Sequence, residues 1–147
     1  MKKNKNKKPK GNQFIKEPIA FNNNINLQEI EEFSKIDYPL FSFKYLQEIS
    51  IKDCKDYKFY HDYIFRLQKL SILGWKEIQK SDRHSFGTEI IAHDMIKPDL
   101  PRHITPEVTL YAMRANGNNL PFIGYREGKV FHVIFIETNF GDIYDHG

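Results

Sequence analysis

The segment EVTLYAMRANGNNLPFIGYREGKVFHVIFIET, residues 107–138, decides the fold class because three apolar runs are separated by two turn sequences. Asn and Gly tolerate positive φ, so NGNN at 116–119 predicts a tight turn, as does Glu-Gly-Lys at 127–129. The runs between them are rich in Val, Ile, Phe and Tyr, which favours extended structure. We therefore predict strands at 107–115, 120–126 and 130–138, followed by a short strand at 143–146.

Upstream of these strands the apolar residues recur with a helical period. Five of them have the spacing of one face of an amphipathic helix, namely Tyr60, Tyr63, Ile64, Leu67 and Leu70. Gly74 is expected to end this helix, and residues 75–82 to add a second, shorter one. An earlier helix is predicted at 27–33, with Asn26 as its N-cap and Glu29 completing a capping box.

Two further strands are predicted before the three-strand segment. Residues 38–49 alternate aromatic and other side chains, as in a half-buried strand, and residues 85–93 resemble a short strand. Residues 97–107 contain three prolines, which excludes a regular element there. Helices followed by consecutive strands indicate an α+β fold. We expect an antiparallel meander of three or four strands plus an N-terminal strand, packed against one or two helices. The apolar strand 130–138 is expected inside the sheet, covered by the long helix and by residues 27–33.

Composition divides the 147 residues into a basic arm and a body. Residues 1–10 carry six of the 22 Lys and Arg residues and no acid, which leaves 16 basic against 19 acidic residues in the remainder. We predict a disordered Lys/Asn-rich arm at 1–24 and a single domain at 25–147. Such an arm suits either nonspecific nucleic-acid binding or simple solubilisation, and the sequence leaves both open.

Cysteine usage and hydropathy indicate a cytoplasmic protein. Cys54 is the single cysteine, so neither an intrachain disulfide nor a Cys-based zinc site is expected. No apolar run has the length of a membrane span, and the Lys residues at the start are not followed by the apolar segment of a secretory signal. We expect no membrane association and no cofactor.

Polar residues suited to acid–base chemistry gather on the predicted meander. These are Arg114, Arg126, His132, Tyr144 and His146. Metal-independent RNA cleavage requires a group that deprotonates the 2′-OH, a cation that stabilises the phosphorane and a proton donor for the leaving 5′-oxygen. Imidazole suits the proton transfers because its pKa lies near neutrality, and guanidinium meets two phosphate oxygens at once. A Tyr hydroxyl can orient the nucleophile, or its ring can stack on a base.

Each of these residues also has a purely structural interpretation. A histidine within an apolar strand is commonly a satisfied core residue, and Arg side chains beside turns are commonly solvated. Tyr144 could close the sheet edge, and His146 lies where chain ends usually fray. A different cluster, His84, His93 and His103 with nearby aspartates, could ligate a metal, but its spacings match no strong zinc pattern. We expect no metal site.

The stretch YAMRANGNNLPFIGYREGKVFHVIFIETNFGDIYDHG, residues 111–147, resembles the RelE/ParE toxin superfamily of bacterial toxin–antitoxin systems. In that family an Arg ends one strand, a Gly-[Tyr/Phe]-Arg piece and an apolar strand follow, and a His/Tyr pair closes the chain. The resemblance covers about residues 40–147. It implies a small twisted antiparallel sheet on helices, and ribosome-associated mRNA cleavage silenced by an antitoxin. It further implies phosphate binding by Arg114 and Arg126, and acid–base catalysis by His146 with Tyr144 assisting or by His132.

Three functions therefore remain open at the level of sequence. The first is a metal-independent endoribonuclease toxin whose partners are RNA, including ribosome-bound mRNA, and an antitoxin. The second is a noncatalytic phage or mobile-element protein that binds a host protein or nucleic acid through its sheet and basic arm. The third is a metal-dependent enzyme that uses the His and Asp residues of 82–103. ParE-like members share the fold and poison gyrase without cleaving RNA, so the fold alone does not give the reaction.

Overall fold

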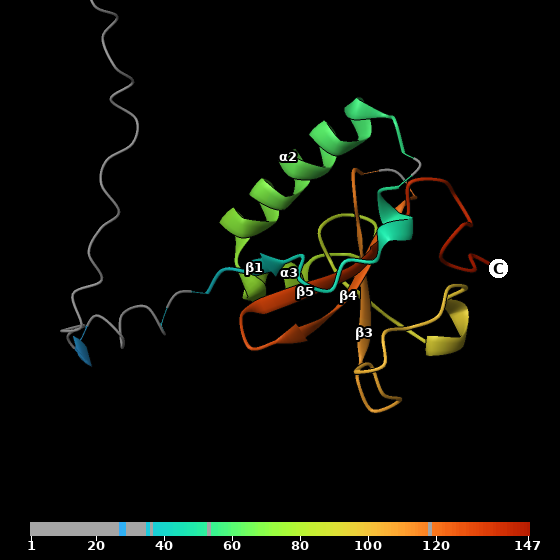
Figure 1. The fold of residues 1–147 in the computed structure, drawn as a ribbon. Helices are drawn as coiled ribbons and strands as arrows, with labels where there is room; N and C mark the ends of the chain where they lie inside the picture. The colour runs from blue at the N-terminus through green and yellow to red at the C-terminus, as the bar shows by residue number, and fades with distance from the viewer. Residues whose placement is uncertain (1–26, 29–34, 36, 53, 118) are drawn as a thin grey trace, which may run out of the picture. The chain divides into compact units, whose positions relative to one another are not determined.

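A computed structural model describes residues 27–28, 35, 37–52, 54–117 and 119–147 (Figure 1). The chain forms two compact units, 1–36 and 37–147, and the fold described below is that of the second unit. The predicted arm at 1–24 and the domain boundary at residue 25 lie outside the described residues. So does nearly all of the predicted helix at 27–33, of which the structure describes Leu27 and Gln28 alone.

The second unit has one five-stranded sheet, which confirms the α+β class. Its strands, in the spatial order β1-β5-β4-β3-β2, are β1 (Leu40–Ser42), β2 (Glu89–Ile91), β3 (Leu110–Arg114), β4 (Pro121–Glu127) and β5 (Val130–Ile136). Strands β2 to β5 form an antiparallel meander of four consecutive strands. The predicted interior position of the apolar strand is also confirmed, because β5 lies between β1 and β4.

Strand β1 makes the sheet mixed, so an all-antiparallel sheet was a wrong expectation. It pairs in parallel with β5, and Leu40 lies beside Val130. A three-residue strand carries no information about its own direction, which depends on its pairing with β5, a strand far along the chain. The short strand predicted at 143–146 does not join the sheet. It makes a single antiparallel bridge between Tyr144 and Ile96.

Two helices follow β1, as predicted. Helix α2 (Tyr57–Leu73) begins at Asp56, whose carboxylate accepts a hydrogen bond of 3.1 Å from the backbone N–H of Phe59. Gly74 separates α2 from α3 (Trp75–Lys80). It has φ of 79°, and a Cβ there would lie 2.2 Å from the Asp37 carbonyl oxygen, so the turn requires glycine.

The face that α2 buries is displaced from the predicted one. The buried residues are Phe59, Tyr63, Leu67 and Leu70. Ile64, expected in the core, is 60% exposed, and Tyr60 is half-buried. Both sets satisfy a period of 3.6 residues, and the sequence between 57 and 73 is apolar over a wide arc. Only contact with the sheet therefore decides which residues are buried.

The sheet is packed on both faces (Figure 1). Helices α2 and α3 cover one face, where Tyr63 and Trp75 pack with Phe122 and Phe131. The other face is covered by irregular chain, which contributes Ile96 and Ile104 from the segment between β2 and β3 and Ile143 from the C-terminal segment. We call these the helix side and the loop side of the sheet.

A β-bulge in β5 changes the strict alternation of side chains. Ile123 pairs with Phe135 and Gly124 with Val133, so Ile134 is an extra residue. Ile134 and Phe135 consequently both pack on the loop side, whereas strict alternation would place Phe135 on the same side as Phe131 and Val133. The carbonyl of Ile134 accepts a hydrogen bond from the Gln47 N–H at 2.8 Å.

Replacing Gly124 with Ala should destabilise the sheet. A Cβ at this position would lie 2.0 Å from the His132 carbonyl oxygen and 2.8 Å from Phe131 Cε1, so backbone would have to move. We expect a loss of about 2 kcal/mol or more in the free energy of unfolding, measured by urea titration followed by circular dichroism. Gly117→Asn is the control, because this turn position has φ of 80° and open space around it, and Asn tolerates that conformation. Equal stability of Gly124→Ala and the native chain would contradict the packing described.

Candidate functional site

A cavity of about 270 Å³ opens on the loop side of the sheet, at the end of β3. Three of the residues predicted from the sequence line it, namely Arg114, Tyr144 and His146. The other lining residues are Arg83, Glu89, Ala112, Met113, Asn119, Pro121 and Phe140. We call it the Arg114 cavity. Its volume is of the size that a phosphate group and part of a nucleotide would fill.

The C-terminal segment reaches this cavity because it is held along residues 95–97. The Lys97 N–H donates to the Ile143 carbonyl at 2.8 Å, and the Asp145 N–H donates to the Met95 carbonyl at 2.9 Å. The Lys97 Nζ also donates to the Gly141 carbonyl at 2.6 Å. These bonds hold the last residues of the chain in place, although fraying is usual at such a position.

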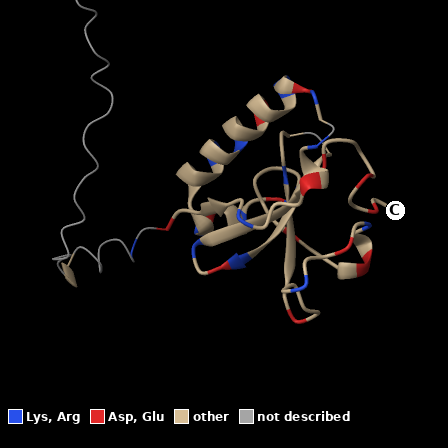
Figure 2. Ribbon diagram, viewed as in Figure 1, with Lys and Arg blue, Asp and Glu red and all other residues tan. Residues whose placement is uncertain are grey.

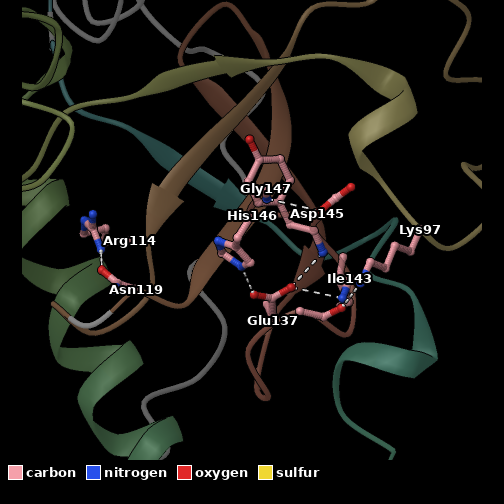
Figure 3. Close-up of polar contacts among 10 residues, drawn as sticks. Lys97, Arg114, Asn119, Glu137, Ile143, Asp145, His146 and Gly147 are labelled. Atoms are coloured by element: carbon pink, nitrogen blue, oxygen red, sulfur yellow. Dashed lines mark hydrogen bonds and ion pairs between the residues drawn. The ribbon is translucent and has the colours of Figure 1, made fainter.

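Glu137 lies beneath the C-terminal segment and is fully buried (Figure 3). Its Oε2 accepts hydrogen bonds from the backbone N–H groups of Ile143 at 3.0 Å and Tyr144 at 2.7 Å. Its Oε1 lies 2.5 Å from His146 Nε2. A buried carboxylate needs such compensation, and here three donors supply it.

The carboxylate of Glu137 also sets the orientation of the His146 ring. An ionised carboxylate only accepts hydrogen bonds, so the proton of a neutral imidazole resides on Nε2 and Nδ1 is the basic nitrogen. Phe140 stacks on the ring with a centroid distance of 3.8 Å, and Tyr144 meets it edge-on at 4.9 Å. The imidazole is therefore held from three directions at the cavity wall. An oriented histidine of this kind is suited to general-base catalysis.

Arg114 is the cationic counterpart of His146 in the cavity. Its Nη1 donates to Asn119 Oδ1 at 2.8 Å, and its Nη2 lies 2.6 Å from His84 Nδ1. Arg83 stands nearby and pairs with Glu89 at 2.9 Å. Burial lowers the pKa of Arg66 on α2, and the like charge of Arg114 lowers it further, but Arg66 does not line this cavity and packs over the Phe86 ring at 4.1 Å.

This local positive charge contrasts with the rest of the unit. Figure 2 shows Lys and Arg interspersed with Asp and Glu along the elements of residues 37–147. The lining of the cavity contains two guanidinium groups, Arg83 and Arg114, and one carboxylate, Glu89, while the buried carboxylate of Glu137 is engaged by its three hydrogen-bond partners. The Arg114 cavity therefore favours an anionic ligand.

Tyr144 takes part in this cavity as a proton-bearing phenol. Its pKa is raised, mainly by burial and then by the negative charges of Glu89 and Asp145, while Arg83 opposes the shift. At neutral pH the hydroxyl consequently keeps its proton. Tyr144 can donate a hydrogen bond to an oxyanion but is not suited to act as a base.

Two of the five predicted site residues do not reach the Arg114 cavity. Arg126 lies on the helix side, with its guanidinium carbon 4.1 Å from the Trp75 ring centroid and its Nε bonded to the Gly128 carbonyl. His132 lies on the loop side but stacks on Tyr125, and its Nε2 contacts Glu127 Oε2 at 3.1 Å. Alternation along β4 separates Arg126 from Tyr125, so the five residues predicted on the meander do not share one cavity.

The sequence interpretation missed Glu137, the residue on which the site depends. A usable signal was present, because an acid that directly follows an apolar strand with two buried faces requires a partner. Arg83, Glu89 and Phe140 were also missed. They come from an irregular segment, a short strand and a turn, where no periodic pattern points to a shared surface.

The three histidines considered for metal binding lie in different surroundings. His84 contacts Arg114, His93 Nε2 contacts the Val108 carbonyl at 2.7 Å, and His103 packs on Tyr45. Within the ranges that the structure describes, no three His, Cys, Asp or Glu side chains are grouped so that they could hold a metal ion. Among these same residues, no helix is long and apolar enough to span a membrane.

No match was found for this chain among family models, curated proteins or solved structures. A functional conclusion must therefore be drawn from the site itself. The fold and the site define a small α+β protein with a mixed five-stranded sheet. One end of that sheet carries a cavity in which guanidinium, imidazole and phenol groups meet.

Replacing Glu137 with Ala should release the C-terminal segment. The change removes the acceptor of two backbone N–H groups and of His146, so we expect a loss of about 2–4 kcal/mol in the free energy of unfolding. Hydrogen exchange of the Ile143 and Tyr144 amides should accelerate at the same time. Asp142→Ala, an exposed acid in the same segment, is the control and should change neither quantity. Unchanged protection of both amides in Glu137→Ala would contradict the role assigned to the carboxylate.

Proposed function

We propose that this protein is a metal-independent endoribonuclease that cleaves mRNA. The observation that carries the proposal is the joint presence of Arg114, Tyr144 and His146 in one cavity. The buried Glu137, which holds His146, strengthens it. Guanidinium, phenol and an oriented imidazole are the groups that RNA cleavage without a metal requires.

In the proposed reaction the Nδ1 of His146 takes the proton of a ribose 2′-OH, and the 2′-oxygen attacks the adjacent phosphorus. Arg114 stabilises the negative charge that accumulates on the phosphate oxygens. The bond to the 5′-oxygen breaks as the Tyr144 hydroxyl donates its proton to this oxygen, and the resulting phenolate takes a proton back from solvent as His146 releases one. The products are a 2′,3′-cyclic phosphate and a 5′-hydroxyl. Glu137 stabilises the imidazolium that His146 becomes, and is a positioning residue.

The biological setting that we propose is that of a RelE-like toxin in the cytoplasm. Its substrate would be mRNA, including ribosome-bound mRNA. A cognate antitoxin would keep its activity silent. The four-stranded meander on two helices supports this proposal because it has the elements of the resembled family. The acidic balance of the chain outside residues 1–10 departs from the basic composition of ribosome-dependent toxins.

A second candidate function is a noncatalytic interaction protein, and the exposed side of α2 favours it. Tyr57, Ile64, Phe65 and Ile72 lie within one arc of the helix and are all more than half exposed. Such a stripe is typical of a surface that binds another protein. If this is the function, Ile64→Lys should abolish capture of the partner, and His146→Ala should have no effect on it. Deleting residues 1–16 tests whether the basic arm contributes.

Arg114→Ala and His146→Ala should each lower RNA cleavage by about a hundredfold or more, because each removes a group that acts only in the transition state. The measurement is initial cleavage rate on a single-stranded RNA, with 5′-end sequencing of RNA from induced bacteria as the cellular readout. Lys76→Ala and His61→Ala are the matched controls, because both residues are exposed on the helices. Native rates in both site variants, with folding unchanged by circular dichroism, would show that the site is wrongly assigned.

A further inference from the structure

A second cavity, of about 570 Å³, lies on the loop side of the sheet and is lined by aromatic rings. Tyr45, His103 and Tyr125 contribute the rings, and we call it the Tyr125 cavity. The other lining residues are Ile104, Val108, Thr109, Tyr111, Arg126 and Glu127. No residue of the proposed catalytic mechanism lines this cavity.

The rings of the Tyr125 cavity form one connected cluster. Tyr45 packs on His103 at a centroid distance of 4.2 Å, and His103 meets Tyr125 at 6.0 Å. Behind Tyr125, His132 stacks at 4.8 Å with an interplanar angle of 23°. His132 Nε2 lies 3.1 Å from Oε2 of Glu127, whose side chain is 76% exposed, so the support behind Tyr125 is the largely buried His132 ring itself. The cavity thus presents flat π-surfaces of constrained orientation to solvent.

The charged groups beside these rings indicate which kind of ligand the cavity would bind. The Lys44 ammonium lies 5.1 Å from the Tyr45 ring centroid, and His103 is an exposed imidazole. Glu127, the acidic residue of the lining, is engaged by His132. Aromatic rings beside the Lys44 ammonium suit a flat, electron-rich group attached to an anion, which is the structure of a nucleotide.

The position of the Tyr125 cavity relative to the Arg114 cavity is also informative. Arg114 pairs with Pro121 on β4, and Tyr125 lies four residues farther along that strand. This separation corresponds to roughly 13 Å at about 3.3 Å per residue. Both side chains belong to the loop side of the sheet, but irregular chain covers Ile123 between them, so an RNA strand that reaches both cavities must pass over this cover and span more than this distance.

We propose that the Tyr125 cavity is a subsite that stacks an unpaired base of the single-stranded RNA whose backbone enters the Arg114 cavity. This inference rests on the proposed function, because it deepens the description of the same substrate. The bases of a duplex are already stacked on one another, so their faces are not available to the exposed faces of the Tyr45 and Tyr125 rings, which stack on each other at a centroid distance of 6.4 Å. The subsite therefore selects single-stranded RNA. Because every base has a face that can stack on an aromatic ring, the subsite does not discriminate between sequences.

The test is the affinity for a ten-nucleotide single-stranded RNA with 2′-O-methyl riboses, which cannot be cleaved through the 2′-oxygen. In fluorescence anisotropy, the Tyr125→Leu variant should bind this RNA at least about fivefold more weakly than the native chain does. A fivefold loss of affinity corresponds to the low end of the stacking free energy of one base. Tyr45→Leu should weaken binding similarly, and Tyr125→Phe, which keeps the ring, should bind within about twofold. Leu preserves apolar bulk, so these variants are expected to fold. Tyr57→Leu, an exposed Tyr on α2, is the matched control.

Native affinity in both Tyr45→Leu and Tyr125→Leu would overturn the proposal, as would equally tight binding of a ten-base-pair duplex. Cleavage of the corresponding ribose RNA by the native protein is measured in parallel, which separates the two ideas. Weakened binding in the Tyr variants without cleavage by the native chain supports the subsite and refutes the endoribonuclease. Cleavage with unaltered binding in both variants supports the endoribonuclease and refutes the subsite.

Discussion

The buried carboxylate of Glu137 is the constraint on which the candidate site depends. It follows β5 directly, so the sheet fixes its position, and its two oxygens hold the C-terminal segment through Ile143, Tyr144 and His146. A charge in this environment is tolerated only when its donors are in place. The strand and the last residues of the chain are thereby coupled, and the His146 ring is held against the cavity wall rather than left at a frayed end.

The second feature that shapes the site is the way the sheet is covered. Helices α2 and α3 cover one side, whereas irregular chain covers the other, and the Arg114 and Tyr125 cavities lie along that second side. Loop-covered surfaces of this kind bring together side chains from segments that are distant in the sequence. The Arg114 cavity combines residues from 83 to 146, and the Tyr125 cavity residues from 45 to 127.

Several features could be predicted because they follow from local chemistry. The Asn-Gly turn at 116–117, the apolar runs on either side of it and the helix beginning after Asp56 each depend on residues close in sequence. Among the site residues, Arg114, Tyr144 and His146 were predicted together and the structure places them in one cavity. Arg126 and His132 were grouped with them because strand membership can be inferred from the sequence, whereas the face and end of the sheet they occupy depend on register.

The sequence by itself determined the α+β class, the antiparallel meander and the residue types available for acid–base chemistry, since these depend on periodicity, turn propensity and composition. The tertiary structure alone decided the parallel pairing of β1, the buried face of α2, the bulge at Ile134 and the burial of Glu137. The physical reason is that each of these features follows from contacts between segments that are distant in the sequence. The free energy of such contacts cannot be inferred from a local sequence pattern.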